Sequence, residues 1–396
     1  MTLAEEFART RFDAIADAIA AGNAGEVRRL GDLARAEYVA VHDGLRDVVG
    51  ATLDFAARET SPEEGEGVGR RVIERMMGEA GAAPQYAQAD LKARVRSIAA
   101  GWHWHVTTFD VAEDDDRITF HLDPCGSGGR LELEGRYDGE NGWLRSARPS
   151  PSTFMQTGFP LYSNHCAEMT RAGLASGNAT FVVEGWDARR CGRCVQHTYK
   201  RADAVPAETY RRVGLKQPAR GPSTGSGRLL SDAELADLAL HPLERAERAV
   251  ARGDRAAADA ALAECREAWG LAMHDAYRRW IWALWHEVAA TLGEEALPRV
   301  VAATAPELIR HRRGGRARDW AAFWSMHLGL RGIDERPDAT VFEVDPAALL
   351  EGGGGEEPGP DAFVQGLAEG LAQRRWDDAG SFAVGGSSLL HRLVCD

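Results

Sequence analysis

The stretch WHWHVTTFDVAEDDDRITFHLDP (residues 102–124) returns in altered form as WSMHLGLRGIDERPDATVFEVDP (residues 324–346). Aligned without a gap, the two share a first tryptophan, a histidine, a phenylalanine and a final Asp-Pro. A repeat of this length predicts two similarly folded units. At the next position the copies differ, because Cys125 is matched by Ala347. The loss of this cysteine from one copy indicates a specific site in the other.

The patterning around these stretches predicts an α+β fold. Residues 30–53 place apolar side chains at three- and four-residue steps, as a helix that buries one face requires. Helices are also expected at residues 68–77, 89–99 and 164–175. Short alternating or β-branched segments predict a small antiparallel sheet from residues 103–110, 117–123, 130–137, 179–184 and 195–200. We therefore expect two tandem copies of a helical bundle followed by a small antiparallel sheet, the second copy being degenerate.

We place the first copy at residues 1–212 and the second at residues 231–396. Residues 213–230 are expected to be a linker, because residues 216–227 (KQPARGPSTGSG) are rich in proline, glycine and serine. The second copy is expected to end in a hairpin at residues 381–394.

The helical parts of the two copies also align. Residues 253–287 match residues 22–55 after one small gap. The matched residues include His42-Asp43 with His274-Asp275, and Arg46 with Arg278. Because the His-Asp pair recurs in the copy without the cysteine, it favours a structural hydrogen bond over a catalytic role.

The composition argues against several classes of partner. The chain has 396 residues and a formal net charge of −13, so neither nucleic acid nor an anionic membrane is attracted to it electrostatically. No apolar run approaches the roughly 18 residues of a membrane helix, and the acidic N-terminal stretch is unlike a signal peptide. We therefore expect a cytoplasmic protein. In that reducing setting, its six cysteines are expected to be thiols or metal ligands.

Most residues with metal-binding chemistry lie in the first copy. They occur in FHLDPCGSGGR, YSNHCAEM and RRCGRCVQH, and they are His121, Asp123, Cys125, His165, Cys166, Cys191, Cys194 and His197. Zinc favours thiolate and imidazole ligands, and its structural sites take four of them. A Cys-x-x-Cys pair offers two thiolates from one turn, and single cysteines elsewhere can complete the set. We therefore predict a metal site, with zinc preferred over iron.

The candidate metal ligands are Cys125, Cys166 and Cys194, followed by His165 and Cys191. The catalytic candidates are Asp123 and His121, because alternation along a strand would place both on one sheet face with Cys125. Three protein ligands plus water would suit hydrolysis, since the metal lowers the pKa of the bound water. Four tight ligands would suit a purely structural site. The sequence leaves this choice open.

A metal-free interpretation concerns Cys125 itself. The Gly-rich turn CGSGGR (residues 125–130) can direct backbone N–H groups at the sulfur, which would lower its pKa and stabilise an oxyanion. A cysteine hydrolase of this kind would use His165 or His121 as its base. The plainer alternative is that Cys125 and Cys166 are small buried core residues and that the Cys-x-x-Cys is incidental.

Three short motifs resemble known small-domain families. They are Asp-Pro-Cys-Gly-Ser-Gly at residues 123–128, Tyr-x-x-His-Cys at residues 162–166, and Cys-x(4)-Tyr-Lys at residues 194–200. Together with Asp187, their order distantly resembles L-2-amino-thiazoline-4-carboxylic acid hydrolase-like and 4-vinyl reductase-type domains. It is closer to that of uncharacterised bacterial proteins. The resemblance implies a small-molecule site beside a cysteine or metal cluster, and a further cysteine where this chain has Ser163, with Cys191 as its substitute.

These observations predict a metal-binding Cys/His protein that binds or acts on a small organic molecule. The reaction would be hydrolysis, at a C–N bond, by metal-bound water. The alternative is a non-catalytic sensor, or a partner of a pathway protein, that carries a structural zinc site. The second alternative is the metal-free cysteine hydrolase. Neither nucleic acid nor membrane is an expected partner.

Overall fold

The computed structural model describes residues 11–79, 90–184, 192–219 and 227–311, together with four strands between residues 331 and 395. The chain divides into two compact units. Unit 1 comprises residues 1–52 and 246–396, and unit 2 comprises residues 53–245. Helices and antiparallel sheets occur together, which confirms the α+β class. Within the described ranges, no helix is both long enough and apolar enough to cross a membrane.

Unit 1 contains most of the long helices. Their order is α2 (Arg11–Ala20), α3 (Ala24–Glu59), α11 (Pro242–Ala251), α12 (Arg255–Cys265), η5 (Arg266–Met273), α13 (His274–Leu292), α14 (Ala296–Thr304) and η6 (Ala305–Ile309). Helix α3 belongs to this unit up to Thr52, and α11 enters it at Ala246. Apolar side chains of α3 recur at helical spacing and are buried, as Leu45 and Val48 are, which confirms the helix expected at residues 30–53.

Residues 253–287 contain one more residue than residues 22–55, with which they align in sequence. This residue falls between Gly253 and His274, where α12 continues into α13 through η5, a stretch of π-helix. A π-helix widens the turn of a continuing helix, so it accommodates a residue that the regular spacing cannot. The gap in the alignment therefore coincides with a local change of helix type.

The strands of unit 1 form an antiparallel sheet of order β5-β6-β8-β7. Their bounds are β5 (Arg331–Glu335), β6 (Thr340–Val344), β7 (Phe382–Ser387) and β8 (Leu390–Cys395). Strands β7 and β8 pair as a hairpin, which confirms the one expected at residues 381–394.

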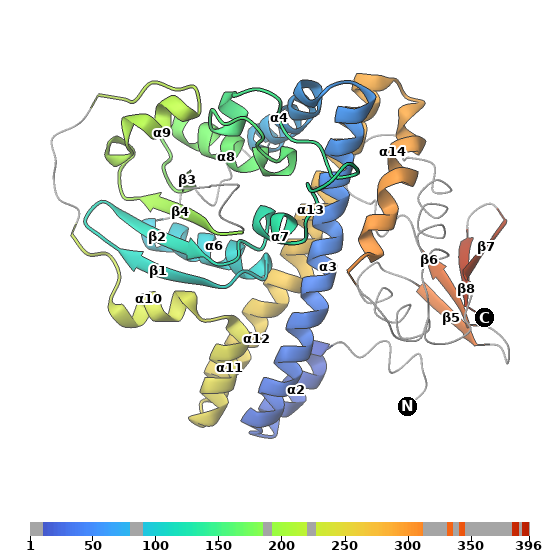
Figure 1. Cartoon of the computed structure of the whole chain (residues 1–396). Helices are drawn as coiled ribbons and strands as arrows, with labels where there is room; N and C mark the ends of the chain where they lie inside the picture. The colour runs from blue at the N-terminus through green and yellow to red at the C-terminus, as the bar shows by residue number, and fades with distance from the viewer. Residues whose placement is uncertain are drawn as a thin grey trace. The chain divides into compact units, whose positions relative to one another are not determined.

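Unit 2 holds another antiparallel sheet, of order β1-β2-β4-β3, between helices (Figure 1). Its strands are β1 (Phe109–Glu113), β2 (Arg117–Leu122), β3 (Val182–Glu184) and β4 (Cys194–Tyr199). The helices are α4 (Pro62–Glu79), α6 (Leu91–Trp104), α7 (Gly128–Leu133), α8 (Asn164–Ala175), α9 (Ala207–Arg212) and α10 (Asp232–Ala239), with short turns η1 (Pro151–Thr153), η2 (Leu161–Ser163) and η4 (Ala202–Ala204). Helix α8 has the bounds expected from the sequence.

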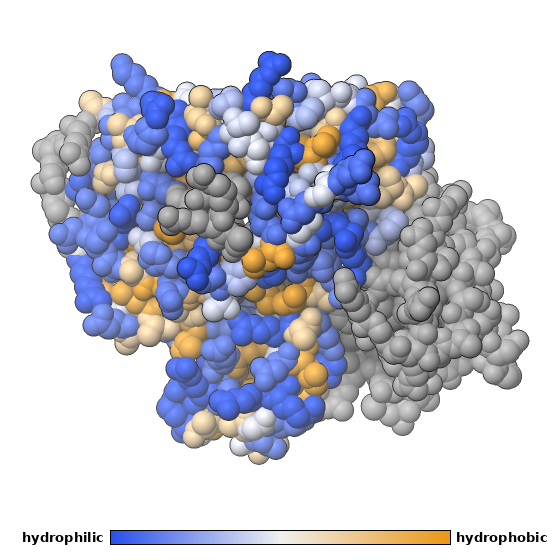
Figure 2. Space-filling model, viewed as in Figure 1, coloured by the Kyte–Doolittle hydropathy of each residue, from blue (hydrophilic) through white to orange (hydrophobic). Residues whose placement is uncertain are grey.

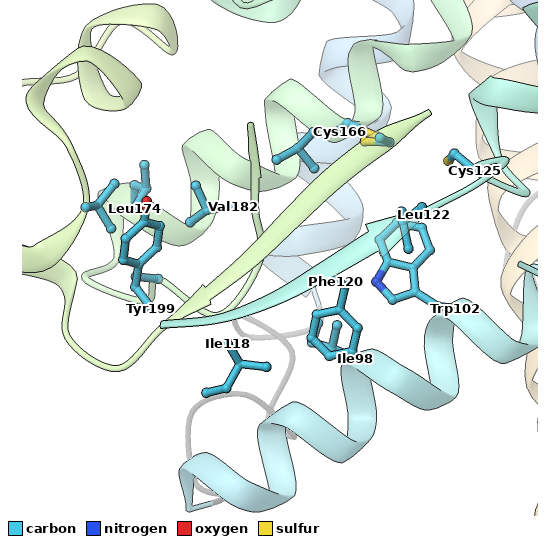
Figure 3. Close-up of a cluster of buried hydrophobic side chains, with 14 of the residues drawn as sticks. Ile98, Trp102, Ile118, Phe120, Leu122, Cys125, Cys166, Leu174, Val182 and Tyr199 are labelled. Atoms are coloured by element: carbon cyan, nitrogen blue, oxygen red, sulfur yellow. The ribbon is translucent and has the colours of Figure 1, made fainter. Parts of the chain in front are cut away.

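The core of unit 2 lies on both faces of this sheet (Figure 3). Phe120 of β2 points toward Ile98 and Trp102 of α6 on one face. Cys166 and Leu174 of α8 lie over the other face. Burying a side chain of the larger apolar types stabilises a fold by roughly 1.5–3 kcal/mol, so this packing fixes α6 and α8 against the sheet. The start of α8 is thereby held near the end of the sheet where β2 finishes and β4 begins.

The strand expected at residues 130–137 is wrong. Its first part belongs to helix α7, and turns follow. Leu131 and Leu133 alternate as in a strand, but Leu131 is fully buried and Leu133 is 54% exposed, so the two side chains do not share a face. Alternation over three residues is too short to distinguish the two structures.

The strand expected at residues 103–110 is correct only at its end. Helix α6 continues through Trp104, and β1 begins at Phe109. His103 is buried in the last turn of the helix, with its ring centre 4.8 Å from that of Phe109. Packing of this histidine against the next strand extends the helix beyond the region of regular apolar spacing.

The surface is largely polar. On the face that Figure 2 shows, hydrophilic residues predominate and apolar residues are scattered in small groups. The large hydrophobic side chains exposed among the described residues are Leu33, Leu133, Met155 and Leu271. Single exposed apolar residues are ordinary for a globular protein. The cysteines of the described residues, in contrast, are all buried.

Candidate functional site

Cys125 lies just after the end of β2, in a loop that folds against the start of β4. Its backbone N–H donates to the carbonyl oxygen of Gly192 at 2.7 Å. The backbone N–H groups of Ser127 and Gly129 and the thiol of Cys194 lie close enough to its sulfur to lower its pKa. The loop thus places polar groups beside one buried sulfur atom.

Two glycines allow the loop to take this form. A Cβ atom on Gly126 would lie 2.1 Å from the carbonyl oxygen of His105, and one on Gly129 would lie 2.2 Å from that of Gly192. Both distances are far shorter than a van der Waals contact, so any other residue would push the neighbouring backbone away. Only glycine permits such a close approach.

The pKa values of the two thiols are shifted in opposite directions. The hydrogen bond from Cys194, supported by the backbone N–H groups and the charge of Arg130, lowers the pKa of Cys125 to about 7 despite burial. The same hydrogen bond, together with burial, raises the pKa of Cys194. The contact between the two thiols therefore favours the thiolate at Cys125 over the thiolate at Cys194. A thiolate is the form of cysteine that binds metals and attacks electrophiles.

A second pair of donors stands at the start of α8. Cys166 Sγ lies 3.3 Å from Nε2 of His165, and Nδ1 of His165 lies 2.6 Å from the carbonyl oxygen of Tyr162. A carbonyl oxygen only accepts, so Nδ1 carries the proton and Nε2 presents its lone pair. Burial lowers the pKa of His165 to about 4 and raises the pKa of Cys166. Both groups are therefore neutral at pH 7.

The two pairs lie at the same end of the sheet. Figure 3 shows Cys125 and Cys166 at this end, with Leu174 and Tyr199 at the other. After burial, the charge of Cys125 is the next cause of the raised pKa of Cys166, so the two sulfur atoms are close enough to interact. Within the described part of unit 2, no three thiol, imidazole or carboxylate donor atoms lie within 4.8 Å of one another. The two donor pairs therefore lie near each other, but their donor atoms do not all converge on one position.

His121 and Asp123 lie outside this group. Both side chains are exposed, and Asp123 forms an ion pair with Arg193 at 2.9 Å. Strand β2 ends at Leu122, so the alternation of side chains stops before Cys125. The prediction that His121, Asp123 and Cys125 share one sheet face is therefore wrong, because Cys125 is buried in the core.

The motif resemblance also involves Asp187, Cys191 and Ser163, and the structure describes only the last of these. Cys191 and Asp187 lie outside the described residues. Ser163, where the resemblance implies a cysteine, is buried, and its hydroxyl has no hydrogen-bond partner among the described residues. A polar atom buried in this way stands beside the donor pairs, since Ser163 directly precedes α8.

His197 is near Cys194 in sequence but belongs to another set of contacts. Its ring nitrogens lie 3.0 Å from Oγ1 of Thr119 and 3.4 Å from Oε2 of Glu184. Burial tends to raise the pKa of Glu184, but hydrogen bonds led by that of His197 outweigh it and lower the pKa. His197 thus holds a polar contact across the sheet, away from the thiols.

Unit 1 contains a buried ion network that the sequence reveals only in part. Nδ1 of His42 lies 2.8 Å from Asp43, which confirms the expected hydrogen bond. Arg46 stands between two carboxylates, 3.3 Å from Asp43 and 2.7 Å from Asp47. His311 lies 2.9 Å from Asp47. Sequence reasoning missed His311, because its partner is remote in the chain and no local pattern connects them.

Comparison with family models, with curated proteins and with solved structures finds no match to this chain. The resemblance carried by the motifs at Cys125, His165-Cys166 and Cys194 therefore stays a prediction. The function has to be inferred from the geometry of these residues.

Proposed function

We propose that the chain binds a thiophilic metal ion, preferentially zinc, through Cys125, Cys194, Cys166 and His165. The observation that carries this proposal is the occurrence of two buried donor pairs, from three separate segments, at one end of the sheet of unit 2. Zinc sites are built from thiolate and imidazole ligands of this kind. Cys191, outside the described residues, is an additional candidate because it forms the Cys-x-x-Cys motif with Cys194.

The state of the donors supports ligand roles. Nδ1 of His165 is taken by the Tyr162 carbonyl, the usual arrangement by which a protein presents the other ring nitrogen to a metal. The lowered pKa of Cys125 favours its thiolate form, and coordination would deprotonate the neighbouring thiols as well. A zinc–sulfur bond is about 2.3 Å long, so binding would also draw the two pairs together.

We extend the proposal to a small organic ligand beside the metal, following the motif resemblance. Hydrolysis of a C–N bond is the proposed reaction if the metal keeps a position for water. A sphere closed by four protein ligands would instead support a sensor or pathway partner with structural zinc. The reducing cytoplasm is the proposed compartment, because it keeps the thiols available as ligands.

We also propose that the chain contains two copies of one architecture and that the second lacks the metal site. The gapless alignment of residues 102–124 with residues 324–346 pairs β1 with β5 and nearly all of β2 with β6. Both sheets have the same strand order, β1-β2-β4-β3 and β5-β6-β8-β7. These agreements support the repeat independently of residue identity.

Elemental analysis of the purified full chain tests the metal site. We expect about one zinc ion per chain, as a single site requires, and a Cys125→Ser/Cys166→Ser variant should contain almost none. Cys265→Ser is the matched control, because Cys265 is equally buried but lies in α12 of unit 1. Equal metal content in the double variant and the unaltered chain would reject the proposed ligands.

A second candidate function is nucleophilic catalysis by Cys125 without a metal. The N–H groups of Ser127 and Gly129 favour it, since they stabilise the thiolate directly. In this case the chain would hold no metal, and a small alkylating reagent would label Cys125 faster than Cys166 at neutral pH. Labelling of each cysteine can be measured by mass spectrometry of peptides. Slow labelling of Cys125 in metal-free protein would count against this candidate.

A further inference from the structure

A hydroxyl, an imidazole and a carboxylate form a line of contacts across the sheet of unit 2. Oγ1 of Thr119 in β2 lies 3.0 Å from Nδ1 of His197 in β4, and Nε2 of His197 lies 3.4 Å from Oε2 of Glu184 in β3. An ionised carboxylate only accepts hydrogen bonds, so Nε2 carries the ring proton and Nδ1 accepts the bond from the Thr119 hydroxyl. The hydroxyl therefore faces the basic nitrogen of a ring that a carboxylate orients.

The pairing of the strands holds these three side chains on one face of the sheet. Thr119 is directly opposite His197 in the antiparallel pair of β2 and β4, so the two side chains lie on the same face. On the other side of β4, Val182 is opposite His197, and Glu184 follows two residues later on that face. The arrangement thus rests on three paired strands, which position side chains more precisely than loops do.

Two further hydroxyl groups hold Glu184 in place. The hydroxyl of Thr209 in α9 donates to Oε1 of Glu184, and that of Tyr199 in β4 donates to the same oxygen at 3.2 Å. Oε2 is the oxygen that faces Nε2 of His197. Because Oε1 is bound from two elements, the carboxylate keeps one orientation, and Oε2 stays directed at the ring.

The sheet face that carries these residues is open to water beside Thr119. In the neighbouring strand β1, Asp110 is opposite His121 and Ala112 is opposite Thr119. Asp110, Ala112 and His121 are exposed. Thr119 borders this open area and keeps 9% of its surface exposed. An antiparallel sheet commonly leaves part of one face solvated, and here the open part gives a small reagent a route to the Thr119 hydroxyl.

We propose that Thr119, His197 and Glu184 form a second reactive site, for acyl transfer from a small ester. Thr119 is its nucleophile, His197 its general base and Glu184 the positioning residue of the base. A hydroxyl becomes a competent nucleophile when it lies within hydrogen-bond reach of a base that a third group orients. This activity requires neither a metal nor a thiol, so it goes beyond the proposed function.

The reaction has two steps that use the same groups. Oγ1 of Thr119 attacks the carbonyl carbon of the ester, and its proton passes to Nδ1 of His197. The bond from this carbon to the alcohol oxygen then breaks, and the alcohol leaves with the proton from His197. Water attacks the acyl group on Thr119 in the second step, with His197 again as base, which releases the acid and restores the hydroxyl.

Labelling of the metal-free full chain with phenylmethylsulfonyl fluoride tests the nucleophile. Oγ1 of Thr119 displaces fluoride from the sulfonyl sulfur, so an O–S bond forms, the S–F bond breaks and the proton passes to His197. We expect about one sulfonyl group per chain, on Thr119, as for a single activated hydroxyl, and mass spectrometry of peptides locates it. A Cys125→Ala background removes the thiol that we proposed as a nucleophile above. Absence of the label from Thr119 in the folded chain would overturn the proposal.

The base is tested by His197→Gln. This substitution should lower the labelling rate of Thr119 by roughly a hundredfold, as for loss of a general base. Thr180→Val is the matched control, because Thr180 is also a buried threonine of unit 2, but its hydroxyl accepts a hydrogen bond from Arg94. The control should be labelled like the unaltered chain. An unchanged rate in His197→Gln would reject the mechanism.

The orienting role of Glu184 needs a readout that a structural role would not affect. Glu184→Ala should lower the labelling rate by roughly tenfold or more, since the ring loses the group that orients it. The side chain of Glu184 is 20% exposed, so added formate can supply the missing carboxylate and should restore part of the rate. Failure of formate to restore it would reject this role. The position of the label in the unaltered chain decides the proposal even if a variant fails to fold.

Discussion

The two sheets of this chain have one topology and different chemistry. Both are antiparallel with the second and fourth strands paired at the centre. At the end of this central pair, Leu122 faces Cys194 in the first sheet, whereas Val344 faces His391 in the second. The sheet therefore forms with or without the cysteine. The thiols of unit 2 are therefore not needed for this strand order, which is consistent with the role as metal ligands that we propose for them.

The two helices that align in sequence also differ in burial. His42, Asp43 and Arg46 are buried in α3, whereas the aligned Asp275 and Arg278 of α13 are 42% and 32% exposed in their side chains. Each helix still pairs its arginine with its aspartate, at 3.3 Å in α3 and 3.0 Å in α13. The two helices carry the same sequence motif, but its contribution to the free energy of unfolding depends on how far burial excludes water from it.

The difference in burial between the two helices predicts its largest effect on stability when their arginines, Arg46 in α3 and Arg278 in α13, are replaced. Arg46→Met should lower the free energy of unfolding by roughly 3–5 kcal/mol, because it removes the buried cation that lies between the carboxylates of Asp43 and Asp47. Arg278→Met removes a half-exposed ion pair and should change stability by less than about 1 kcal/mol. Urea denaturation of the full chain measures both, and similar losses in the two variants would refute the contrast.

The next effect concerns the dependence of stability on pH. The pKa of His165 is lowered from 6.5 to about 4 by burial, so the folded chain favours the neutral ring. Its contribution to stability is complete above the unfolded pKa of 6.5 and is lost as the pH falls toward about 4. The loss should approach about 3 kcal/mol in metal-free protein.

Denaturation at a series of pH values measures this loss. His165→Gln should flatten the fall in stability over this interval, because the unfolded chain then has one proton fewer to gain. The matched control is His121→Gln, since the ring of His121 is exposed on the same unit. An unchanged slope in His165→Gln would mean that the folded chain tolerates the charged ring.

The sequence predicted the elements better than the contacts of the site. Helix α8 and the hairpin of β7 and β8 follow from periodicity and turn residues, which are local signals. The motifs of Cys125, Cys166 and Cys194 flank the same strands, and these three residues belong to one buried core; that they share a metal ion stays a prediction. The hydrogen bonds from Arg130 to the carbonyl oxygens of His105 and Val106, just after α6, could not be predicted. They depend on the left-handed backbone of Val106 and on packing between residues remote in sequence.

The smallest effect tests whether polar contacts between strands follow the same contrast. Thr119 faces His197 across β2 and β4, whereas the aligned Val341 faces Val394 across β6 and β8. Thr119→Val keeps the size of the side chain but leaves Nδ1 of the buried His197 without the hydroxyl at 3.0 Å. The cost should be about 1 kcal/mol, since a lost partner leaves the other buried group unsatisfied. Thermal denaturation measures it, with Thr119→Ser as a control that keeps the hydroxyl. If the valine variant is as stable as the unaltered chain, the hydroxyl of Thr119 contributes nothing measurable to the stability of this sheet, and the polar pair is not what distinguishes it.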